Sequence, residues 1–265
     1  MNEVAKRPTF TMTINSDGYK KLINKTLGDP TKAQRFIASI TSAVVTNPQL
    51  SDCDANSIIS AGFLGESLNL SPSPQLGQYY LVPFNDNKNH RKVAQFQLGY
   101  KGYIQLAIRS GYYTKLNVLA IKEGELVKFD PLNEEIEVNL IADEDARETA
   151  ETIGYYAMFE YTNGFRKAMY WSKVKMEAHA LKYSMGYKAK KGYTFWEKDF
   201  DGMAYKTMLR QLISKWGIMS TDMQDAISKD MGVLHEDGRV DYIDNDEPIP
   251  QEEPSVESEV NINEI

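Results

Sequence analysis

The residues of this chain that could act on another molecule are cations interleaved with aromatic rings. Lys101 and Arg109 recur on one side of a predicted helix, and Lys206 and Arg210 recur on a second one. Further cations occupy two polar loops: Lys88, Arg91, Lys92, Lys188, Lys190 and Lys191. Because cations attract phosphates and aromatic rings stack on unpaired bases, the combination favours a nucleic-acid ligand.

Three more residues, Tyr103, Gln105 and Trp196, complete the set of predicted DNA contacts. For the aromatic residues Tyr100, Tyr103, Trp171 and Trp196, a place in the core is the alternative to stacking on bases. For each loop lysine, the alternative is a solvated surface position without a partner. The helical cationic faces, rather than the number of tryptophans, therefore carry the prediction.

The net charge of −7 conceals an uneven distribution. Residues 236–265 contain eleven acidic residues and one basic residue, which leaves a charge of +3 on residues 1–235. Within that body, residues 164–216 contain twelve Lys or Arg and four Asp or Glu. Phosphate is attracted by the local electrostatic field and not by the net charge of the whole chain, so this basic region is compatible with DNA binding.

Motifs for nucleotide-driven chemistry are missing. A phosphate-cradling loop needs a Gly-Lys dipeptide, and a dinucleotide site needs Gly-x-Gly-x-x-Gly, but the sequence contains neither. We therefore expect no nucleotide cofactor and no ATP requirement. The single cysteine, Cys53, has no partner for an internal disulfide, and we assign it no chemistry.

Paired carboxylates leave a metal-dependent nuclease open as an alternative. Asp52 with Asp54, and Asp199 with Asp201, could hold divalent ions, but both pairs stand at predicted helix starts, where carboxylates cap free N–H groups. His179 is interpreted as a partly buried histidine rather than a ligand. We predict no catalytic residue, no metal and no enzymatic activity, with a nuclease and a structural or adaptor polymer as the rival functions.

The elements that position the cations begin with the stretch 75–111. Residues 76–84 predict a strand, residues 85–92 a polar basic loop at the hairpin tip, and residues 93–98 a second strand. From Tyr100 onward the period becomes helical, with Tyr103 and Ala107 on the core side and Lys101, Gln105 and Arg109 on the other.

Two or three helices between residues 17 and 68 precede this hairpin, and strands dominate after it. We expect a meandering antiparallel sheet from strands at 112–121, 125–129, 136–140, 153–161 and 165–171, with a tight turn at Asn163-Gly164. Helices follow at 172–185 and 196–216. On the latter, Met208 and Leu209 lie in the apolar stripe, and Lys206 and Arg210 are expected on the opposite, solvated side.

These elements predict an α+β fold in which helices pack on antiparallel hairpins and sheet. We divide the chain into a flexible N-terminus (1–16), a helical region (17–70) that is the candidate oligomer contact, an α+β DNA-binding core (71–235) and a disordered acidic tail (236–265). No apolar run is long enough to span a membrane and no signal peptide is recognisable, so we expect a cytoplasmic protein.

Two segments carry a resemblance to a known family. Two runs resemble the signature of the RecT family of phage single-strand annealing proteins: Leu-Gly-Gln-Tyr-Tyr-Leu-Val-Pro-Phe at 76–84 and Gln-Leu-Gly-Tyr-Lys-Gly-Tyr-Ile-Gln-Leu-Ala-Ile-Arg-Ser-Gly at 97–111. The run 203–212 resembles the family's Lys-Thr-x-x-Arg helix, with Lys206, Thr207 and Arg210 in place. A single arginine, followed by Gln211, departs from the paired arginines of some relatives.

The resemblance implies ATP-independent annealing of complementary single strands in phage-type homologous recombination. It also implies a fold related to that of eukaryotic annealing proteins, and an oligomeric ring or helical filament on single-stranded and annealed duplex DNA. The partners it implies are an exonuclease and the host single-strand-binding protein, with the acidic tail as a candidate contact. Physically, we expect cations of the two helices to line one groove that screens phosphate repulsion.

Overall fold

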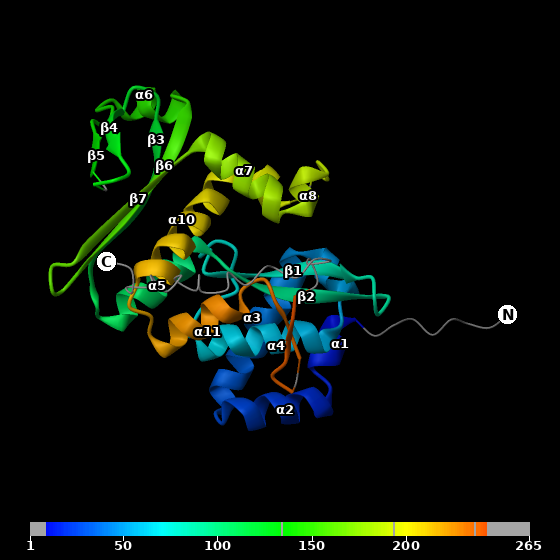
Figure 1. Ribbon diagram of the computed structural model, residues 1–265. Helices are drawn as coiled ribbons and strands as arrows, with labels where there is room; N and C mark the ends of the chain where they lie inside the picture. The colour runs from blue at the N-terminus through cyan, green and yellow to red at the C-terminus, as the bar shows by residue number, and fades with distance from the viewer. Residues whose placement is uncertain (1–8, 134, 193, 236, 243–265) are drawn as a thin grey trace, which may run out of the picture.

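The computed structural model describes residues 9–133, 135–192, 194–235 and 237–242 (Figure 1). The N-terminal part is helical, with a 3₁₀ helix between the last two α-helices: α1 (Phe10–Ile14), α2 (Asp17–Leu27), α3 (Pro30–Thr46), η1 (Pro48–Asp52) and α4 (Ala55–Ser67). Phe10 and Ile14 of α1 are buried in the core. The expectation of a flexible segment up to residue 16 is therefore wrong for residues 10–14, because α1 anchors itself through these two side chains.

The hairpin and helix of the central stretch follow: β1 (Tyr79–Asp86), β2 (Arg91–Leu98) and α5 (Tyr100–Ser110). The strands pair antiparallel from Tyr79 opposite Leu98 to Asp86 opposite Arg91. The hairpin tip is thus shorter than the predicted loop, and Arg91 and Lys92 belong to the strand. Gly99 connects strand to helix at a point where a Cβ would overlap the backbone of Gly77, so this close approach requires glycine.

The outer edge of β2 is covered by other parts of the chain. The N–H groups of Ala94, Phe96 and Leu98 donate to Ser57 Oγ (2.9 Å), Gly232 O (3.0 Å) and Asp230 Oδ1 (2.8 Å). In return, the Phe96 carbonyl accepts from Met231 N–H at 2.8 Å. Buried backbone groups must find partners, and here two side chains and the segment after α11 supply them.

The second half contains a three-stranded antiparallel sheet with an insertion. Its elements are β3 (Tyr113–Lys122), β4 (Leu126–Asp130), β5 (Glu135–Val138), α6 (Glu144–Thr149), β6 (Thr152–Tyr161) and β7 (Arg166–Ser172). The sheet order is β3-β6-β7, and β4 pairs only with β5. The predicted tight turn at Asn163-Gly164 is confirmed, with Gly164 at φ +85°. The simple meander is wrong, because β4, β5 and α6 form a separate lobe between β3 and β6 (Figure 1).

Helices dominate the last part, which ends in a short hairpin. They are α7 (Lys173–Tyr183), α8 (Met185–Lys188), α9 (Phe195–Lys198), α10 (Phe200–Trp216) and α11 (Thr221–Lys229), followed by β8 (Val233–Leu234) and β9 (Val240–Asp241). The observed architecture confirms the α+β class with small antiparallel sheets. The predicted acidic tail lies outside the described residues from residue 243 onward. Within the described part of the chain, no helix combines the length and apolar character needed to cross a membrane.

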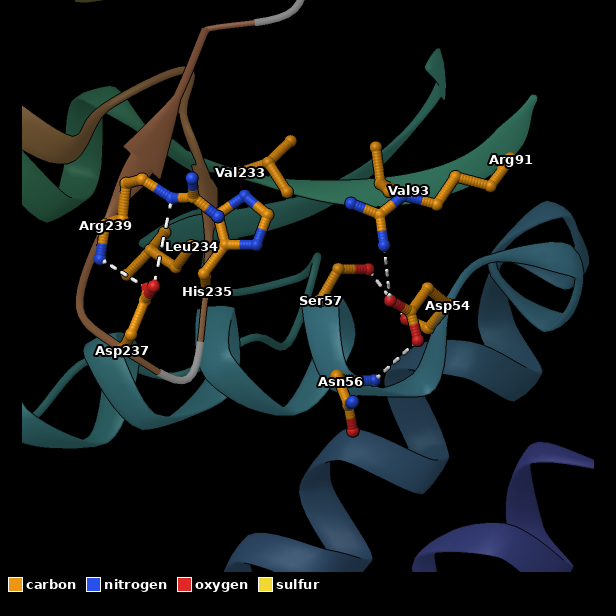
Figure 2. A pocket seen from close by; sticks show the side chains of 10 residues that line it. All are labelled: Asp54, Asn56, Ser57, Arg91, Val93, Val233, Leu234, His235, Asp237 and Arg239. Carbon is orange, nitrogen blue, oxygen red and sulfur yellow. Dashed lines mark hydrogen bonds and ion pairs between the residues drawn. The ribbon is translucent and has the colours of Figure 1, made fainter. Parts of the chain in front are cut away.

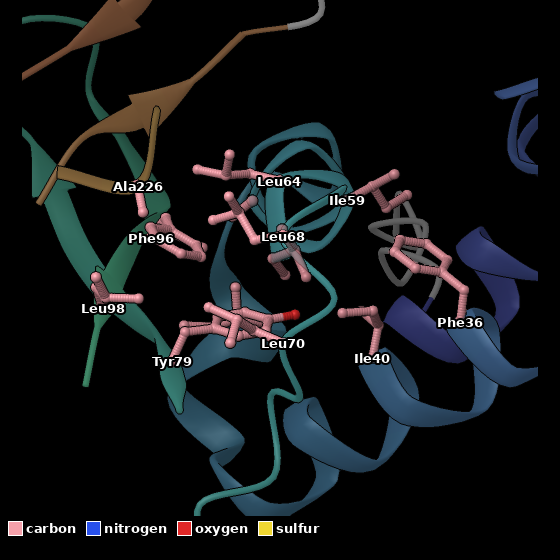
Figure 3. Packing of buried hydrophobic residues seen from close by; sticks show 14 of the residues in the cluster. Phe36, Ile40, Ile59, Leu64, Leu68, Leu70, Tyr79, Phe96, Leu98 and Ala226 are labelled. Carbon is pink, nitrogen blue, oxygen red and sulfur yellow. The ribbon is translucent and has the colours of Figure 1, made fainter. Parts of the chain in front are cut away.

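Two hydrophobic clusters hold the molecule together, and α10 contributes to both. The first joins the N-terminal helices, the β1–β2 hairpin, α5 and α11, and Figure 3 shows Ile40 of α3 beside the ring of Tyr79 of β1 in it. The second lies between the β3-β6-β7 sheet, α7 and α9. Leu209 and Ile213 of α10 enter the first cluster. Met208 and Leu212 enter the second.

Gly65 offers a test of this packing. A Cβ at Gly65 of α4 would overlap the buried ring of Tyr79, whereas a Cβ at Gly18 of α2 meets nothing within 4 Å. Gly65→Ala should lower the free energy of unfolding by about 1–3 kcal/mol through overpacking. Gly18→Ala should leave it unchanged or raise it by up to about 1 kcal/mol, because alanine is the better helix former. Denaturant unfolding of both variants measures the difference, and equal effects would contradict the described contact.

Candidate nucleic-acid interface

Helix α5 presents the predicted polar face to solvent. Lys101, Gln105 and Arg109 are exposed, while Tyr103 and Ala107 are fully buried. The exposure of the three polar residues confirms the helical pattern. Tyr103, which was grouped with the DNA contacts, has its ring enclosed in the core, and this position favours a structural role.

Arg109 is also engaged within the protein. Its Nη2 donates to the Leu68 carbonyl at 2.7 Å and its Nη1 to the Asn69 carbonyl at 3.3 Å. Helix α4 ends at Ser67, and the last carbonyls of a helix lack intrahelical partners. Arg109 therefore ties α5 to the C-terminal end of α4, where a cation also interacts favourably with the helix dipole.

Asp230, at the end of α11, binds both cations of the Lys-Thr-x-x-Arg helix. Its Oδ1 accepts from Lys206 Nζ at 3.0 Å, and its Oδ2 accepts from Arg210 Nη1 at 2.7 Å. The same carboxylate accepts from the Leu98 N–H at 2.8 Å and faces the Tyr103 hydroxyl at 3.5 Å. One buried carboxylate thus joins α10, β2, α5 and the end of α11.

The prediction that Lys206 lies on a solvated face is wrong. Lys206 is 6% exposed and Asp230 is 2% exposed, so their ion pair is internal. Burial lowers the pKa of the Lys206 ammonium, although the charge of Asp230 opposes this shift. Lys206 lies on this side of α10 as the partner of Asp230. Because Asp230 is 24 residues away in the sequence, helical periodicity does not reveal this pair.

Arg210 differs from Lys206 because its side chain remains 35% exposed. Two cations face one carboxylate in this cluster, so one positive charge is left without an anion from Asp230. Arg210 brings that surplus charge to the surface. Of the two predicted α10 contacts, Arg210 is therefore the one that an external phosphate could reach.

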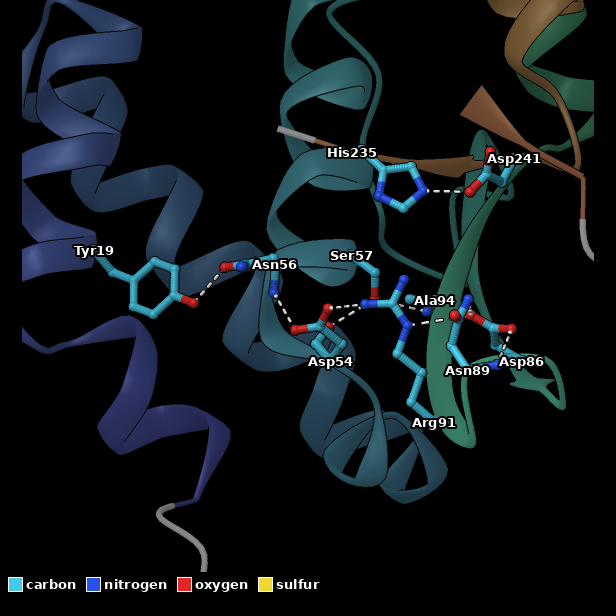
Figure 4. A network of polar contacts seen from close by, with 10 residues as sticks. All are labelled: Tyr19, Asp54, Asn56, Ser57, Asp86, Asn89, Arg91, Ala94, His235 and Asp241. Carbon is cyan, nitrogen blue, oxygen red and sulfur yellow. Dashed lines mark hydrogen bonds and ion pairs between the residues drawn. The ribbon is translucent and has the colours of Figure 1, made fainter. Parts of the chain in front are cut away.

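The cations of the β1–β2 hairpin form ion pairs with nearby carboxylates. Arg91 contacts Asp54 at 3.3 Å and Asp86 at 3.2 Å, as Figure 4 shows, and Lys92 contacts Asp52 at 2.8 Å. Hydrogen bonds from Asn89 and Arg91 hold the pKa of Asp86 below its ordinary value. These contacts fasten the hairpin to α4 and η1.

Lys88 lies exposed in the hairpin turn. Near the tip end of the hairpin, a polar pocket of about 340 Å³ lies between α4, β2 and the β8–β9 hairpin. It is lined by both signs of charge, including Arg91, Arg239, Asp54 and Asp237 (Figure 2). The mixed charge provides no distinct attraction for phosphate.

The predicted basic loop after α8 is exposed and anchored at its C-terminal end. Lys188, Lys190 and Lys191 all face solvent. Trp196, which was grouped with the DNA contacts, is 7% exposed and packs against Phe200 at a centroid distance of 5.1 Å. Its position favours a role in anchoring α9 beneath the loop rather than in stacking on bases.

An aromatic contact connects this loop region to the start of α5. The rings of Tyr80 in β1 and Phe195 in α9 lie 5.3 Å apart. Lys101 and Tyr80 both border Gly77. A Cβ placed on Gly77 would lie 3.1 Å from Tyr80 Oη and 3.3 Å from Lys101 Cδ, so the two side chains are neighbours. Lys101 and the loop that leads into Phe195 therefore border the same end of the hairpin, which the sequence alone did not indicate.

A second aromatic group, at the end of β7 and on α7, was also missed. Trp171 and His179 are 5.5 Å apart, and His179 and Tyr183 are 4.5 Å apart. Lys175 lies 4.4 Å from the centroid of the Trp171 ring, and Lys182 lies 5.1 Å from that of Tyr183. Lys175, His179 and Tyr183 are spaced by four residues along α7 and therefore share one helix face, and Trp171 adjoins them from the end of β7.

The candidate metal and thiol groups have structural roles. Asp54 caps α4 by accepting from Asn56 N–H, and Asp199 caps α10 by accepting from Gly202 N–H, which confirms the capping interpretation. Among the residues the structure describes, no cluster of three or more His, Cys, Asp or Glu could hold a metal ion. Burial raises the pKa of the Cys53 thiol to about 12, which disfavours the nucleophilic thiolate.

Removal of the Asp230 carboxylate should be costly. Asp230→Ala leaves the buried Lys206 without its anion, and breaking such a pair costs about 3–5 kcal/mol of the free energy of unfolding. The matched control is Asp225→Ala, since Asp225 pairs with Lys229 one turn away on the surface of α11 at 2.7 Å, a type of pair worth about 0.3–0.5 kcal/mol. Chemical unfolding of the two variants gives the comparison, and a small loss for Asp230→Ala would refute the internal ion pair.

Comparison with known proteins identifies the family. Residues 34–248 match the model of the RecT family. An uncharacterized protein, YqaK of Bacillus subtilis (strain 168), is 41% identical over 219 residues, which cover 83% of this chain and 71% of the relative. Protein RecT of Escherichia coli (strain K12) is 31% identical over 222 residues, which cover 82% of this chain and 78% of the relative. The chain therefore belongs to the RecT family, a family of single-strand annealing proteins of DNA recombination.

Proposed function

We propose that this protein anneals complementary DNA strands without ATP and holds both the single strand and the newly paired duplex. The observation that carries the proposal is the placement of Lys101 and the basic loop around the Tyr80–Phe195 contact, together with the surplus positive charge at Arg210. Family membership supports the annealing activity.

The mechanism we propose requires no bond to be broken by the protein. Exposed cations, with Lys101, Arg210 and the loop lysines 188, 190 and 191 as the main candidates, neutralise phosphates of two strands and reduce their mutual repulsion. Gln105 can donate to phosphate oxygens beside them. Base edges stay free, so Watson–Crick pairing rather than the protein selects the complementary strand.

Lys88, Arg91 and Lys92 form a second candidate contact at the hairpin. Lys92 is paired with Asp52 at an exposed position, where an ion pair contributes little to stability, whereas Arg91 is held by the buried Asp86 as well as by Asp54 and offers its partly exposed side chain. Arg109 and Lys206, which are engaged internally, act in the proposal by positioning α5 and α10 rather than by touching DNA. The same applies to Tyr103 and Trp196 in the core.

We further propose that the active form is a homo-oligomer, either a ring or a helical filament. Each protomer neutralises few phosphates, whereas neighbours along a strand bind cooperatively. The helices between residues 17 and 70 are the candidate contact, and Leu22 and Val45 there are exposed apolar side chains. A head-to-tail contact of this kind is heterologous and can generate either assembly.

Three further parts of the proposal concern the origin of the fold, the partners of the protein and its acidic tail. The fold is proposed to be related to that of eukaryotic annealing proteins. An exonuclease that exposes single strands is the proposed functional partner. The acidic tail, residues 236–265, is proposed either to contact the host single-strand-binding protein or to compete with DNA for the basic surface.

An annealing assay tests the proposed function. Complementary oligonucleotides mixed with the protein in EDTA and without ATP should form duplex faster than they do alone, because phosphate repulsion is screened while no hydrolysis is needed. Gel electrophoresis follows duplex formation and strand length together. Strands that are shortened when magnesium is added, or pairing at the uncatalysed rate, would refute the proposal.

The salt dependence of binding tests the proposed cations. The affinity for a single strand should fall with salt at a logarithmic slope of about 0.7 per neutralised phosphate. Lys101→Gln should reduce that slope by about 0.7, since one phosphate contact is lost. Lys128→Gln in the β4–β5 lobe removes the same charge from a surface pair with Glu135 and serves as the control. Equal slopes for Lys101→Gln and Lys128→Gln would exclude Lys101 from the interface.

A further inference from the structure

An aromatic stripe, called here the α7 stripe, consists of Trp171 at the end of β7 and of His179 and Tyr183 on α7, with Lys175 and Lys182 beside its rings. The centroid distances of 5.5 Å and 4.5 Å make the three rings one continuous group. Both lysines are exposed and lie over the first and last rings at 4.4 Å and 5.1 Å. Cations placed over ring faces are held by the ring quadrupole.

The stripe is not simply an edge of the core. Tyr183 is 53% exposed, so one of its faces is available to solvent. Trp171, at the other end of the stripe, packs against the second hydrophobic cluster, so the stripe runs from the core to the surface. An exposed ring that is held in place by a second ring is a preformed surface, because its orientation is already fixed before any ligand arrives.

The stripe also lies close to the cation that the Asp230 cluster brings to the surface. Burial, together with the smaller contributions of the Lys182 and Arg210 charges, lowers the pKa of His179 to about 4. At neutral pH His179 is uncharged, so it serves as an aromatic ring between Trp171 and Tyr183.

We propose that the α7 stripe is a stacking platform for unpaired bases of single-stranded DNA, with Tyr183 as the ring that receives a base. The inference rests on the proposed DNA-binding function and assigns to it a site for bases in addition to the sites for phosphates. The rings already touch one another at the spacing of direct aromatic pairs, so a base adds to the exposed face of Tyr183 rather than between rings.

The two lysines complete the platform by their placement. When a base covers the Tyr183 face, Lys182 is available to a phosphate of the same strand, and Lys175 and Arg210 are candidates for adjacent phosphates. Stacking tolerates any sequence because every base has a π face. A strand held in this way keeps its pairing edges accessible, as annealing requires.

The test compares a normal strand with one that lacks bases. Affinities of the full chain for an oligodeoxythymidylate and for an abasic oligomer of equal length are measured at one salt concentration. Tyr183→Leu should weaken binding of oligodeoxythymidylate by about 5-fold or more, in line with the loss of one stacked base, and should leave binding of the abasic oligomer unchanged. Tyr183→Phe retains the ring and should bind both ligands as the unsubstituted protein does.

Lys182→Gln serves as the comparison variant, because loss of a phosphate contact should weaken both ligands equally. If Tyr183→Leu weakens both ligands equally, or neither, the stacking platform is refuted while the annealing function stands. If the unsubstituted protein binds neither oligomer, the proposed DNA-binding function itself fails. Since Tyr183 is exposed, the leucine variant should unfold at the same denaturant concentration as the unsubstituted protein, which confirms that the effect is on binding.

Discussion

The arrangement of the described elements depends on the carboxylate of Asp230. It receives hydrogen bonds from β2 and from two cations of α10, it faces the hydroxyl of Tyr103 in α5, and it stands at the end of α11. An ion removed from water is stable only when several donors replace the lost hydration. This requirement explains why segments far apart in the sequence converge on one buried acid.

Different faces of helix α10 pack against the two hydrophobic clusters of the molecule. Leu209 packs with the N-terminal cluster, Met208 packs with the sheet cluster, and Lys206 and Arg210 reach Asp230 from successive turns. Residues four apart lie on the same side of a helix, so the Lys-Thr-x-x-Arg pattern delivers two cations to a single carboxylate. The motif that marks the family is thus also a structural contact between the halves.

Much of the local structure was predictable, because it follows from period and turn chemistry. The hairpin, the exposed face of α5 and the turn at Gly164 all come from local patterns. The burial of Lys206 was not predictable, since its cause is a carboxylate distant in sequence. The same holds for Arg109, whose acceptors are carbonyls at the end of another helix. The sequence pattern around a lysine on a polar helix face is the same whether its side chain contacts solvent or a buried anion.

The sequence indicated the class of ligand for the candidate site but not which side chains are exposed there. Basic segments interleaved with aromatics pointed to phosphate and bases, and Lys101 and the loop lysines are exposed as expected. Which rings are enclosed was not evident, because Trp196 and Tyr103 occur in the same sequence neighbourhoods as exposed cations. The short helix α1 was not predicted, because its five residues are too few to show a helical period.

The covered edge of β2 restricts how copies of the chain can join. Ser57, Asp230 and the 231–232 backbone already use the groups with which β2 could bind a strand from another molecule. A strand with its edge occupied cannot template the addition of a foreign one. Copies of this chain that keep the fold intact therefore cannot join by adding a strand to this edge, and the edge is protected from amyloid-like stacking.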